Sequence, residues 1–326
     1  MPDSALQKKI EVDAKTLAAV KKEIGKAVVG QEATVESLIT ALLANGNVLL
    51  EGVPGIAKTL IIRTFANVLG CKFSRIQFTP DLLPSDITGI TTYDKVHGFT
   101  IVKGPIFANF VLADEINRAP PKVQSTLLEA MQERQVTIGK QTFLLDPPFF
   151  VLATQNPIES LGTYPLPEAQ IDRFLFKLTI SYPNAEDEQK ILNQNISIHE
   201  LGHFNLKTVV TAKRILEMQA DTKAIYVDPK IEKYIVELVT ATRKPEHLKL
   251  GKYVEWGASP RASISLYIAA KARALQDGKA FVTPHHVKLV APDVLRHRII
   301  LNYEGQAERI TPDLIIHEIL TKVPIP

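Results

Sequence analysis

The chain has 326 residues, a formal net charge of +3, and one cysteine, Cys71. This weak positive charge does not by itself indicate a nucleic-acid partner. A single cysteine excludes an internal disulfide framework and fits a reducing compartment. No apolar run approaches the roughly 20 residues that span a bilayer, and the charged amphipathic start of the chain lacks the apolar core of a signal peptide. We therefore expect a cytoplasmic protein of about two domains, with no membrane insertion.

The first 183 residues alternate between apolar runs and segments of helical spacing. Residues 5–45 are expected to be helical, and the spacing is clearest over 31–43. The strands expected after them cover residues 47–50, 73–78, 107–112, 149–153 and 174–180, and the helices expected between them cover 57–69 and 120–133. Strands that alternate with helices predict a parallel, helix-covered sheet, here an α/β domain over residues 1–183.

Two stretches interrupt this alternation with the pattern of β-hairpins. Residues 90–104 are expected to turn at Val96-His97-Gly98, and residues 134–145 at Gly139-Lys140. Both hairpins are either surface embellishments or projections toward a partner or a pore, and the sequence leaves these two interpretations open.

Residues 184–326 have a different character and are expected to be almost entirely helical. Three helix starts carry a capping residue before a proline, at Ser259-Pro260, Thr283-Pro284 and Thr311-Pro312. The expected helices cover residues 186–195, 206–220, 228–243, 260–274, 284–298 and 312–322. We predict a smaller helical domain here, in which the sequence assigns no role to residues 300–326.

The stretch GVPGIAKT, residues 52–59, follows the first expected strand and opens a helix. It fits the phosphate-binding pattern G-x-x-x-x-G-K-[ST], except that Ala57 replaces the second glycine, a change that helix-like dihedrals would tolerate. Lys58 would reach the β- and γ-phosphates and Thr59 would hold Mg²⁺. The alternative is an ordinary strand–turn–helix with a chance Lys-Thr pair. The residues expected to bind nucleotide here are Gly52, Val53, Pro54, Gly55, Ile56, Ala57, Lys58, Thr59 and Leu60.

Polar side chains also follow two later strands. Asp114 and Glu115 end an apolar run, where Asp114 could hold Mg²⁺ through water and Glu115 could polarise the attacking water. Asn156 ends the next run and could orient that water or contact the phosphate. Taken alone, the two acids could be a solvated turn, and Asn156-Pro157 could be a turn. The loop and the acids together predict a nucleotide-binding site.

With these motifs the sequence resembles the MoxR family of AAA+ ATPases. The matching strings are GVPGIAKT, LADEINRAPPKVQSTLLEAMQERQVT, ATQNPIE, GTYPLPEAQIDRF and GASPRAS, and the resemblance covers roughly residues 25–300. Alanine at the position of Ala57 is common in such loops, so it does not argue against ATP binding. The resemblance implies an AAA+ core with a helical lid, ATP and Mg²⁺ as cofactors, and a homo-oligomeric ring that is commonly a hexamer.

The resemblance also implies roles for single residues. Lys58 and Thr59 would match Walker A, and Asp114 and Glu115 would match Walker B. The segment Val28–Glu32 resembles the part of the family that packs on adenine, with Val29 and Gly30 as contact residues. The hairpin at 90–104 would be the insert in helix 2, and the hairpin at 134–145 would be the one preceding sensor 1.

Three further polar residues take positions that the resemblance links to catalysis. Asn156 would be sensor 1, Arg173 the arginine finger that acts on the neighbouring subunit's ATP, and Arg261 sensor 2 in the lid. The alternative for each arginine is a solvated or carboxylate-paired side chain, with Asp172 as an obvious partner for Arg173.

Three more charged or aromatic side chains lie near these motifs in the sequence. Arg118 and Lys122 follow Walker B and either face the adjoining subunit or are surface charges. Trp256 is expected to pack within the lid rather than to stack on a base.

Three functions are compatible with these motifs. The first is an ATP-driven remodelling chaperone whose clients are other proteins; the resemblance suggests partners with von Willebrand A domains. The second is a nucleic-acid motor, which we do not expect because the hairpins carry mixed charges rather than a basic stripe. The third is a non-hydrolysing scaffold, which predicts a broken Glu115, Asn156 or Arg173, whereas all three residue types are present.

Overall fold

A parallel five-stranded sheet forms the centre of the first half of the chain. The computed structural model describes residues 4–52, 58–95, 98–156, 162–194 and 204–326. The strand order is β2-β5-β8-β1-β9, and every pair is parallel. The five strands are β1 (Val48–Gly52), β2 (Phe73–Gln77), β5 (Phe110–Asp114), β8 (Phe150–Gln155) and β9 (Phe176–Ile180). This arrangement confirms the predicted α/β fold class.

Helices cover both faces of the sheet, as a parallel sheet requires. Successive strand residues alternate between two apolar cores. Leu50 packs in the core that contains α1, α2 and α3, whereas its neighbour Leu49 packs in the core that contains α5. The helices of this half are α1 (Ser4–Ile24), α2 (Glu32–Leu43), α3 (Lys58–Val68), α4 (Pro84–Thr88), α5 (Pro121–Glu133), α6 (Glu168–Ile171) and α7 (Ala185–Gln194).

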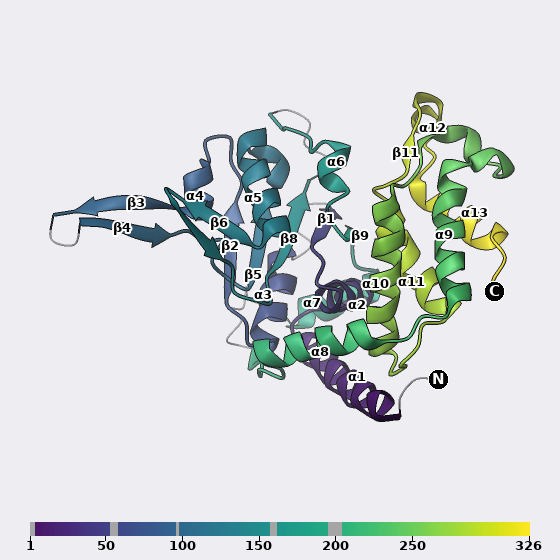
Figure 1. Cartoon of the computed structure of the whole chain (residues 1–326), viewed down its shortest axis with the longest axis horizontal. Coiled ribbons are helices and arrows are strands. Elements are labelled where there is room, and N and C mark those ends of the chain that lie inside the picture. Colours follow the sequence, from purple (N-terminus) through teal and green to yellow (C-terminus); the bar gives the residue numbers. More distant parts are fainter. Residues whose placement is uncertain (1–3, 53–57, 96–97, 157–161, 195–203) are drawn as a thin grey trace.

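The second half is helical, and its helices gather beside the sheet (Figure 1). Its core is continuous with the core on the α1–α3 side of the sheet, so the two halves share one apolar interior. The helices are α8 (Ala212–Ala224), α9 (Pro229–Arg243), α10 (Pro260–Gln276), α11 (Pro284–Leu295), α12 (Tyr303–Ala307) and α13 (Pro312–Lys322). The division of the chain at residue 183 stays a prediction.

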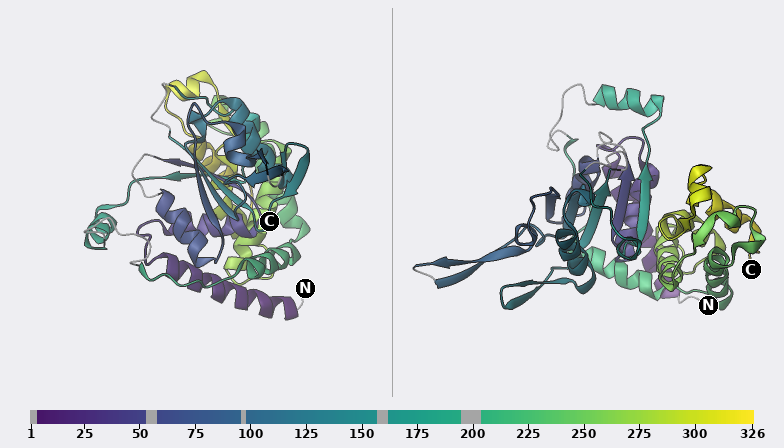
Figure 2. Two further views of the ribbon diagram at one scale, coloured as in Figure 1. Left: turned by 90° about the vertical axis from the view of Figure 1, so that its left-hand side faces the viewer. Right: turned by 90° about the horizontal axis from the view of Figure 1, so that it is seen from above.

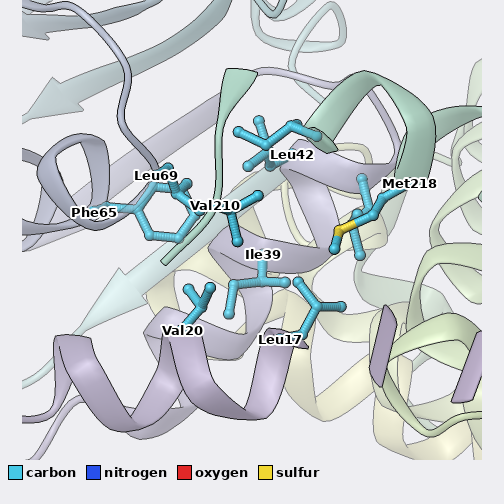
Figure 3. A pocket seen from close by; sticks show the side chains of 10 residues that line it. Leu17, Val20, Ile39, Leu42, Phe65, Leu69, Val210 and Met218 are labelled. Atoms are coloured by element: carbon cyan, nitrogen blue, oxygen red, sulfur yellow. The ribbon is translucent and has the colours of Figure 1, made fainter. Parts of the chain in front are cut away.

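An apolar junction joins α1, α2, α3 and α8 (Figure 3). Leu17 and Val20 of α1, Ile39 of α2, Phe65 of α3 and Met218 of α8 line a small cavity there. All five side chains are almost fully buried. The cavity is therefore part of the shared interior, where α8 covers the same helices that cover the sheet.

The strands of both predicted hairpins are present, and both hairpins extend from the same side of the molecule (Figures 1 and 2). Val96 and His97 of the first predicted turn lie outside the described residues. The first pairs β3 (Gly89–Asp94) with β4 (Gly98–Lys103), and the second pairs β6 (Gln135–Ile138) with β7 (Gln141–Leu144). The Lys103 ammonium lies over the Phe107 and Phe143 rings, 4.7 and 5.3 Å from their centroids. This cation–π contact links the bases of the hairpins.

Some element boundaries differ from the sequence predictions. α8 begins at Ala212 rather than near residue 206, because the Thr211 hydroxyl accepts the Arg214 N–H and caps the helix there. Before it, the Val209 N–H bonds the Val68 carbonyl, which keeps this segment beside α3. The expectation that Trp256 packs within the lid is wrong. Its side chain lies in β10 (Val254–Trp256), which pairs with β11 (Ile300–Leu301), and the residue is 66% exposed.

The described part of the chain has no helix that is both long and apolar enough to cross a membrane.

Candidate active site

The predicted site lies at the carboxyl ends of β1, β5 and β8, next to the start of α3. Residues Val53, Pro54, Gly55, Ile56 and Ala57 of the predicted loop lie outside the described residues. Lys58, Thr59 and Leu60 form the first turn of α3. The ends of neighbouring parallel strands and a helix N-terminus meet here, which is where such folds bind phosphates.

Lys58 connects the start of α3 to the strand ends. Its ammonium donates a hydrogen bond to the Gly52 carbonyl. Burial lowers the pKa of Lys58, while the nearby carboxylates of Asp114, Glu115 and Glu51 act in the opposite direction. The ammonium therefore lies among three acids, and phosphate oxygens would be further anionic partners for it.

Asp114 ends β5 and is held from two sides. One carboxylate oxygen, Oδ1, accepts the Thr154 hydroxyl at 2.7 Å. The other, Oδ2, accepts Arg75 Nη2 at 2.6 Å and Nε at 3.1 Å. The Asp114 side chain is 13% exposed, so its charge is oriented and balanced by an arginine of the neighbouring strand β2.

Glu115 directly follows and has a left-handed backbone, with φ 57° and ψ 50°. This conformation is uncommon for residues other than glycine. Its N–H donates to the Thr154 hydroxyl at 2.8 Å, and its carboxylate accepts Gln77 Nε2 at 2.8 Å. Arg118 Nε lies 3.2 Å from the same carboxylate oxygen. Arg118 is therefore an ion-pair partner of Glu115 within one chain, an arrangement that the sequence did not predict.

Asn156 follows β8, the strand between β5 and β1, and is 7% exposed. The fold thus brings Lys58, Asp114, Glu115 and Asn156 to one edge of the sheet, as their places after successive strands predicted. Their catalytic roles stay predictions.

The donor groups at this edge suit Mg²⁺. Among the described residues, no cluster of three or more histidine, cysteine or carboxylate side chains could hold a metal ion. Mg²⁺ does not need such a cluster, because it usually binds one or two protein oxygens together with substrate phosphates and water. The Asp114 carboxylate and the Thr59 hydroxyl are oxygen donors of this kind.

Arg173 lies outside this group, directly after α6. Its side chain is exposed, and it has no ion pair or side-chain hydrogen bond to the described residues. Asp172, which the sequence offered as its partner, binds other groups instead. Asp172 Oδ1 accepts Arg298 Nε at 2.7 Å, and Oδ2 lies 3.2 Å from Arg261 Nη1. Arg261, the predicted sensor 2 residue, thus shares with Arg298 the carboxylate of the residue that precedes Arg173 in the chain.

Arg298 was not predicted and is the most buried charged group at this junction. Its side chain is 2% exposed. Besides Asp172, its guanidinium bonds the backbone carbonyls of Phe174 and Leu175. It follows α11 in a short run of basic residues, and no local pattern distinguishes it from its neighbours.

The segment expected to pack on adenine lies beside α7. Gly30 has φ 72°, and a Cβ placed on it would lie 2.8 Å from Asp187 Oδ2 of that helix. Only glycine fits this close approach without a shift. Val29 and Gly30 are both half-buried, so the segment is accessible in part. Their contact with adenine stays a prediction.

Comparison with known proteins identifies the family. The family model "ATPase family associated with various cellular activities (AAA)" matches residues 47–176, and the AAA lid domain matches residues 250–319. Chaperone MoxR1 of Mycobacterium tuberculosis is 48% identical over 310 residues, which cover 93% of this chain and 81% of that protein. The chain belongs to the MoxR family of AAA+ ATPases. As a member it binds nucleotide and hydrolyses ATP, and the helical second half contains the AAA lid.

Two further comparisons cover nearly the whole chain. Protein MoxR of Methylorubrum extorquens is 32% identical over 327 residues and covers 95% of each chain. The crystal structure of a Cytophaga hutchinsonii protein assigned as an ATPase superposes with a TM-score of 0.90, at 46% identity and 98% coverage of both chains. The likeness therefore extends over the whole described fold, including the lid.

Proposed function

We propose that this protein hydrolyses ATP with Mg²⁺ at the interfaces between subunits of a homo-oligomeric ring, and that it uses this energy to remodel client proteins. The observation that carries the proposal is the position of Arg173. Its guanidinium is exposed, whereas Lys58, Asp114 and Glu115 of the same chain face one another at the sheet edge. A separate exposed arginine suits an active site completed by a second subunit.

In this proposal each polar group has one task. Lys58 would exchange the Gly52 carbonyl for phosphate oxygens. Asp114 and Thr59 would hold Mg²⁺, which would supply positive charge next to the phosphates. Glu115 leaves Gln77 or Arg118 to polarise the attacking water. Asn156 orients that water, and Arg173 of the adjoining subunit stabilises the charge that develops on the phosphate, a contribution of about 10³-fold or more in such enzymes.

The side chains on the first hairpin favour the proposal that the clients are proteins rather than nucleic acids. Tyr93 and Phe99 stack edge to face on the first hairpin, with ring centroids 5.2 Å apart, and are 68% and 78% exposed. The neighbouring charges are of both signs, Asp94 and Lys95, which is not the basic stripe that follows a nucleic-acid backbone. The relative named Chaperone MoxR1 agrees with a client-remodelling role. Clients with von Willebrand A domains follow from the family resemblance alone.

The decisive experiment measures phosphate release against protein concentration for wild type, Arg173→Ala and Glu115→Gln, with ATP binding checked in each. Arg309→Ala, another exposed arginine, is the matched control. We expect wild-type specific activity to rise with concentration. Arg173→Ala and Glu115→Gln should each lose at least about 10²-fold in turnover while still binding ATP, since each removes a group that acts on the transition state.

Mixing the two inactive variants tests the shared site directly. A ring that contains both forms has some interfaces with intact Glu115 from one subunit and intact Arg173 from the next. We expect part of the activity to return in the mixture. Activity that is independent of concentration and of Arg173 would contradict the ring mechanism and favour a self-contained nucleotide switch.

A further inference from the structure

Thr154 occupies a special register position in the central sheet. Its backbone pairs with Leu50 of β1 on one side. On the other side, the last residues of β8 and β5 that pair are Ala153 and Ala113. One step further along β5 comes Asp114, which is outside the β5–β8 ladder. The Thr154 side chain, on a residue that is 1% exposed, therefore lies where the backbone pairing between β5 and β8 stops.

The Thr154 hydroxyl replaces the missing pairing with two hydrogen bonds. It donates to Asp114 Oδ1 at 2.7 Å and accepts the Glu115 N–H at 2.8 Å. A hydroxyl has a single proton, so the Thr154 hydroxyl donates to Asp114 alone. One oxygen atom thus fixes the side chain of the first acid and the backbone of the second.

Glu115 needs such a restraint because its backbone is left-handed. For a residue other than glycine this conformation persists only where the surroundings over-determine it. The Glu115 N–H is held by Thr154, and its carbonyl accepts the Arg118 N–H at 2.9 Å in the following turn. Only the first of these two bonds ties Glu115 to another strand of the sheet.

We propose that Thr154 is a positioning residue for ATP hydrolysis, whose hydroxyl sets the direction of Glu115 relative to Asp114. The inference rests on the proposed function, which gives the two acids their roles. Thr154 does not touch the reacting atoms. It acts through Glu115, so its loss should slow turnover more than it weakens nucleotide binding.

The test compares Thr154→Val, which keeps the shape but removes both hydrogen bonds, with Thr154→Ser, which keeps the hydroxyl. For Thr154→Val we expect kcat to fall about tenfold to a hundredfold, the size expected for a lost hydrogen bond to a charged group. The dissociation constant of ADP, measured by calorimetry without Mg²⁺, should change by less than about twofold, because Lys58 and the loop are unchanged. Thr154→Ser should keep kcat within about threefold of wild type.

Thr222→Val serves as the matched control for stability. Thr222 is 3% exposed in α8, and its hydroxyl donates to the Met218 carbonyl at 2.8 Å. It should lose stability, seen as a lower melting temperature, without a change in kcat. If Thr154→Val does not fold, Thr154→Ala removes the same hydroxyl without placing a methyl group against the Asp114 carboxylate.

The outcomes separate this inference from the proposed function. Turnover near wild type for Thr154→Val, in a protein in which Glu115→Gln is inactive, would overturn the positioning role alone. A fall that Thr154→Ser does not rescue, or that Thr222→Val reproduces, would also overturn it. Full turnover by Glu115→Gln would instead show that the proposed role of Glu115 itself is wrong.

Discussion

The Arg298 guanidinium lies 2.7 Å from the Asp172 carboxylate, and this ion pair joins the lid to the segment that carries Arg173. The two residues come from opposite halves of the chain, yet the Arg298 side chain is only 2% exposed and that of Asp172 only 16% exposed. Arg298 also bonds the carbonyls of Phe174 and Leu175, so it holds the backbone on the far side of Arg173 as well. A lid residue therefore holds the backbone on both sides of Arg173.

Replacement of Arg298 by methionine should be strongly destabilising. It leaves four backbone carbonyls without this donor, and it leaves the Asp172 carboxylate with only the Arg261 guanidinium and the Ser259 hydroxyl. Removal of one member of a buried pair costs about 3–5 kcal/mol. Urea unfolding would measure the loss as a lower midpoint. Lys252→Met removes an exposed ion pair with Glu304, whose side chains are 58% and 56% exposed, and should cost about 1 kcal/mol or less. Equal losses in the two variants would show that the Arg298 contact is not a structural anchor.

Arg261 shares Asp172 in this structure, and we expect it to leave that carboxylate when it binds phosphate. Asp172 then competes with ATP for Arg261. The Arg261 side chain is 55% exposed, and exposed pairs are worth about 0.2–1 kcal/mol, so Asp172→Asn should tighten ATP binding by about twofold to fivefold.

A double-mutant cycle isolates this effect from the loss of the Arg298 pair. In an Arg261→Ala background, Asp172→Asn should leave the affinity for ATP unchanged. Trp256 is the single tryptophan of the chain, and it lies in β10 before Arg261, so its fluorescence offers a convenient titration signal. The same change in affinity in both backgrounds would mean that Asp172 does not act through Arg261.

Much of the fold followed from local patterns in the sequence. The strands of the sheet have the short apolar runs, and the helices the spacing and caps, that physical rules expect. At Ser259-Pro260, for example, the Ser259 hydroxyl accepts the Arg261 N–H at 3.2 Å, as a capping residue before a proline should. The edge of the sheet that gathers Lys58, Asp114, Glu115 and Asn156 followed from the same alternation.

The contacts that orient the residues of the site have no local pattern in the sequence that would have predicted them. Arg298 and Asp172 are 126 residues apart, and only the packing of the lid beside the sheet makes them partners. Thr154 looks like an ordinary β-branched residue of a buried strand, and its second role depends on the register of β8 against β5. Long-range register and domain packing are tertiary properties, so a single sequence gives no direct access to them.

Gly30→Ala should damage the segment expected to pack on adenine. An added Cβ meets Asp187 Oδ2 at 2.8 Å, and φ is 72°. Gly98 has a similar φ of 70° with nothing within 4 Å of its Cβ position, so Gly98→Ala reports the backbone strain alone. We expect Gly30→Ala to cost about 1–3 kcal/mol more than Gly98→Ala in urea unfolding, the range for overpacking, and to weaken ADP binding.

A second substitution that removes the contact between residues 30 and 187 tests whether this contact is the reason for the glycine. The added Cβ would also lie 2.9 Å from Asp187 Cβ, so the double variant Gly30→Ala/Asp187→Gly, which removes that atom as well, should recover most of the extra loss relative to Asp187→Gly alone. If Gly30→Ala costs as much in the Asp187→Gly background as in the wild type, then the close approach of Asp187 is not the reason that glycine is needed.

His286 in α11 should make stability depend on pH. It is fully buried, its Nδ1 accepts the Thr283 N–H at 3.0 Å, and burial lowers the pKa of His286 to about 4 even though Asp277 lies nearby. An unfolded histidine has a pKa of about 6.5. Between these two pH values His286 is protonated in the unfolded chain but not in the folded chain. The free energy of unfolding should therefore fall by about 3 kcal/mol as the pH drops from about 6.5 to about 4.

The variant His286→Asn keeps an acceptor near the position of Nδ1 but cannot be protonated in this range. At pH 7 it should be less stable than wild type, because the smaller side chain leaves a cavity. As the pH falls toward 4, the gap should narrow by about 3 kcal/mol, since only the wild type loses this contribution. The exposed neighbour variant His285→Asn should instead follow the wild-type curve. Parallel curves for wild type and His286→Asn, measured by urea unfolding at several pH values, would show that the buried ring is not the group that titrates.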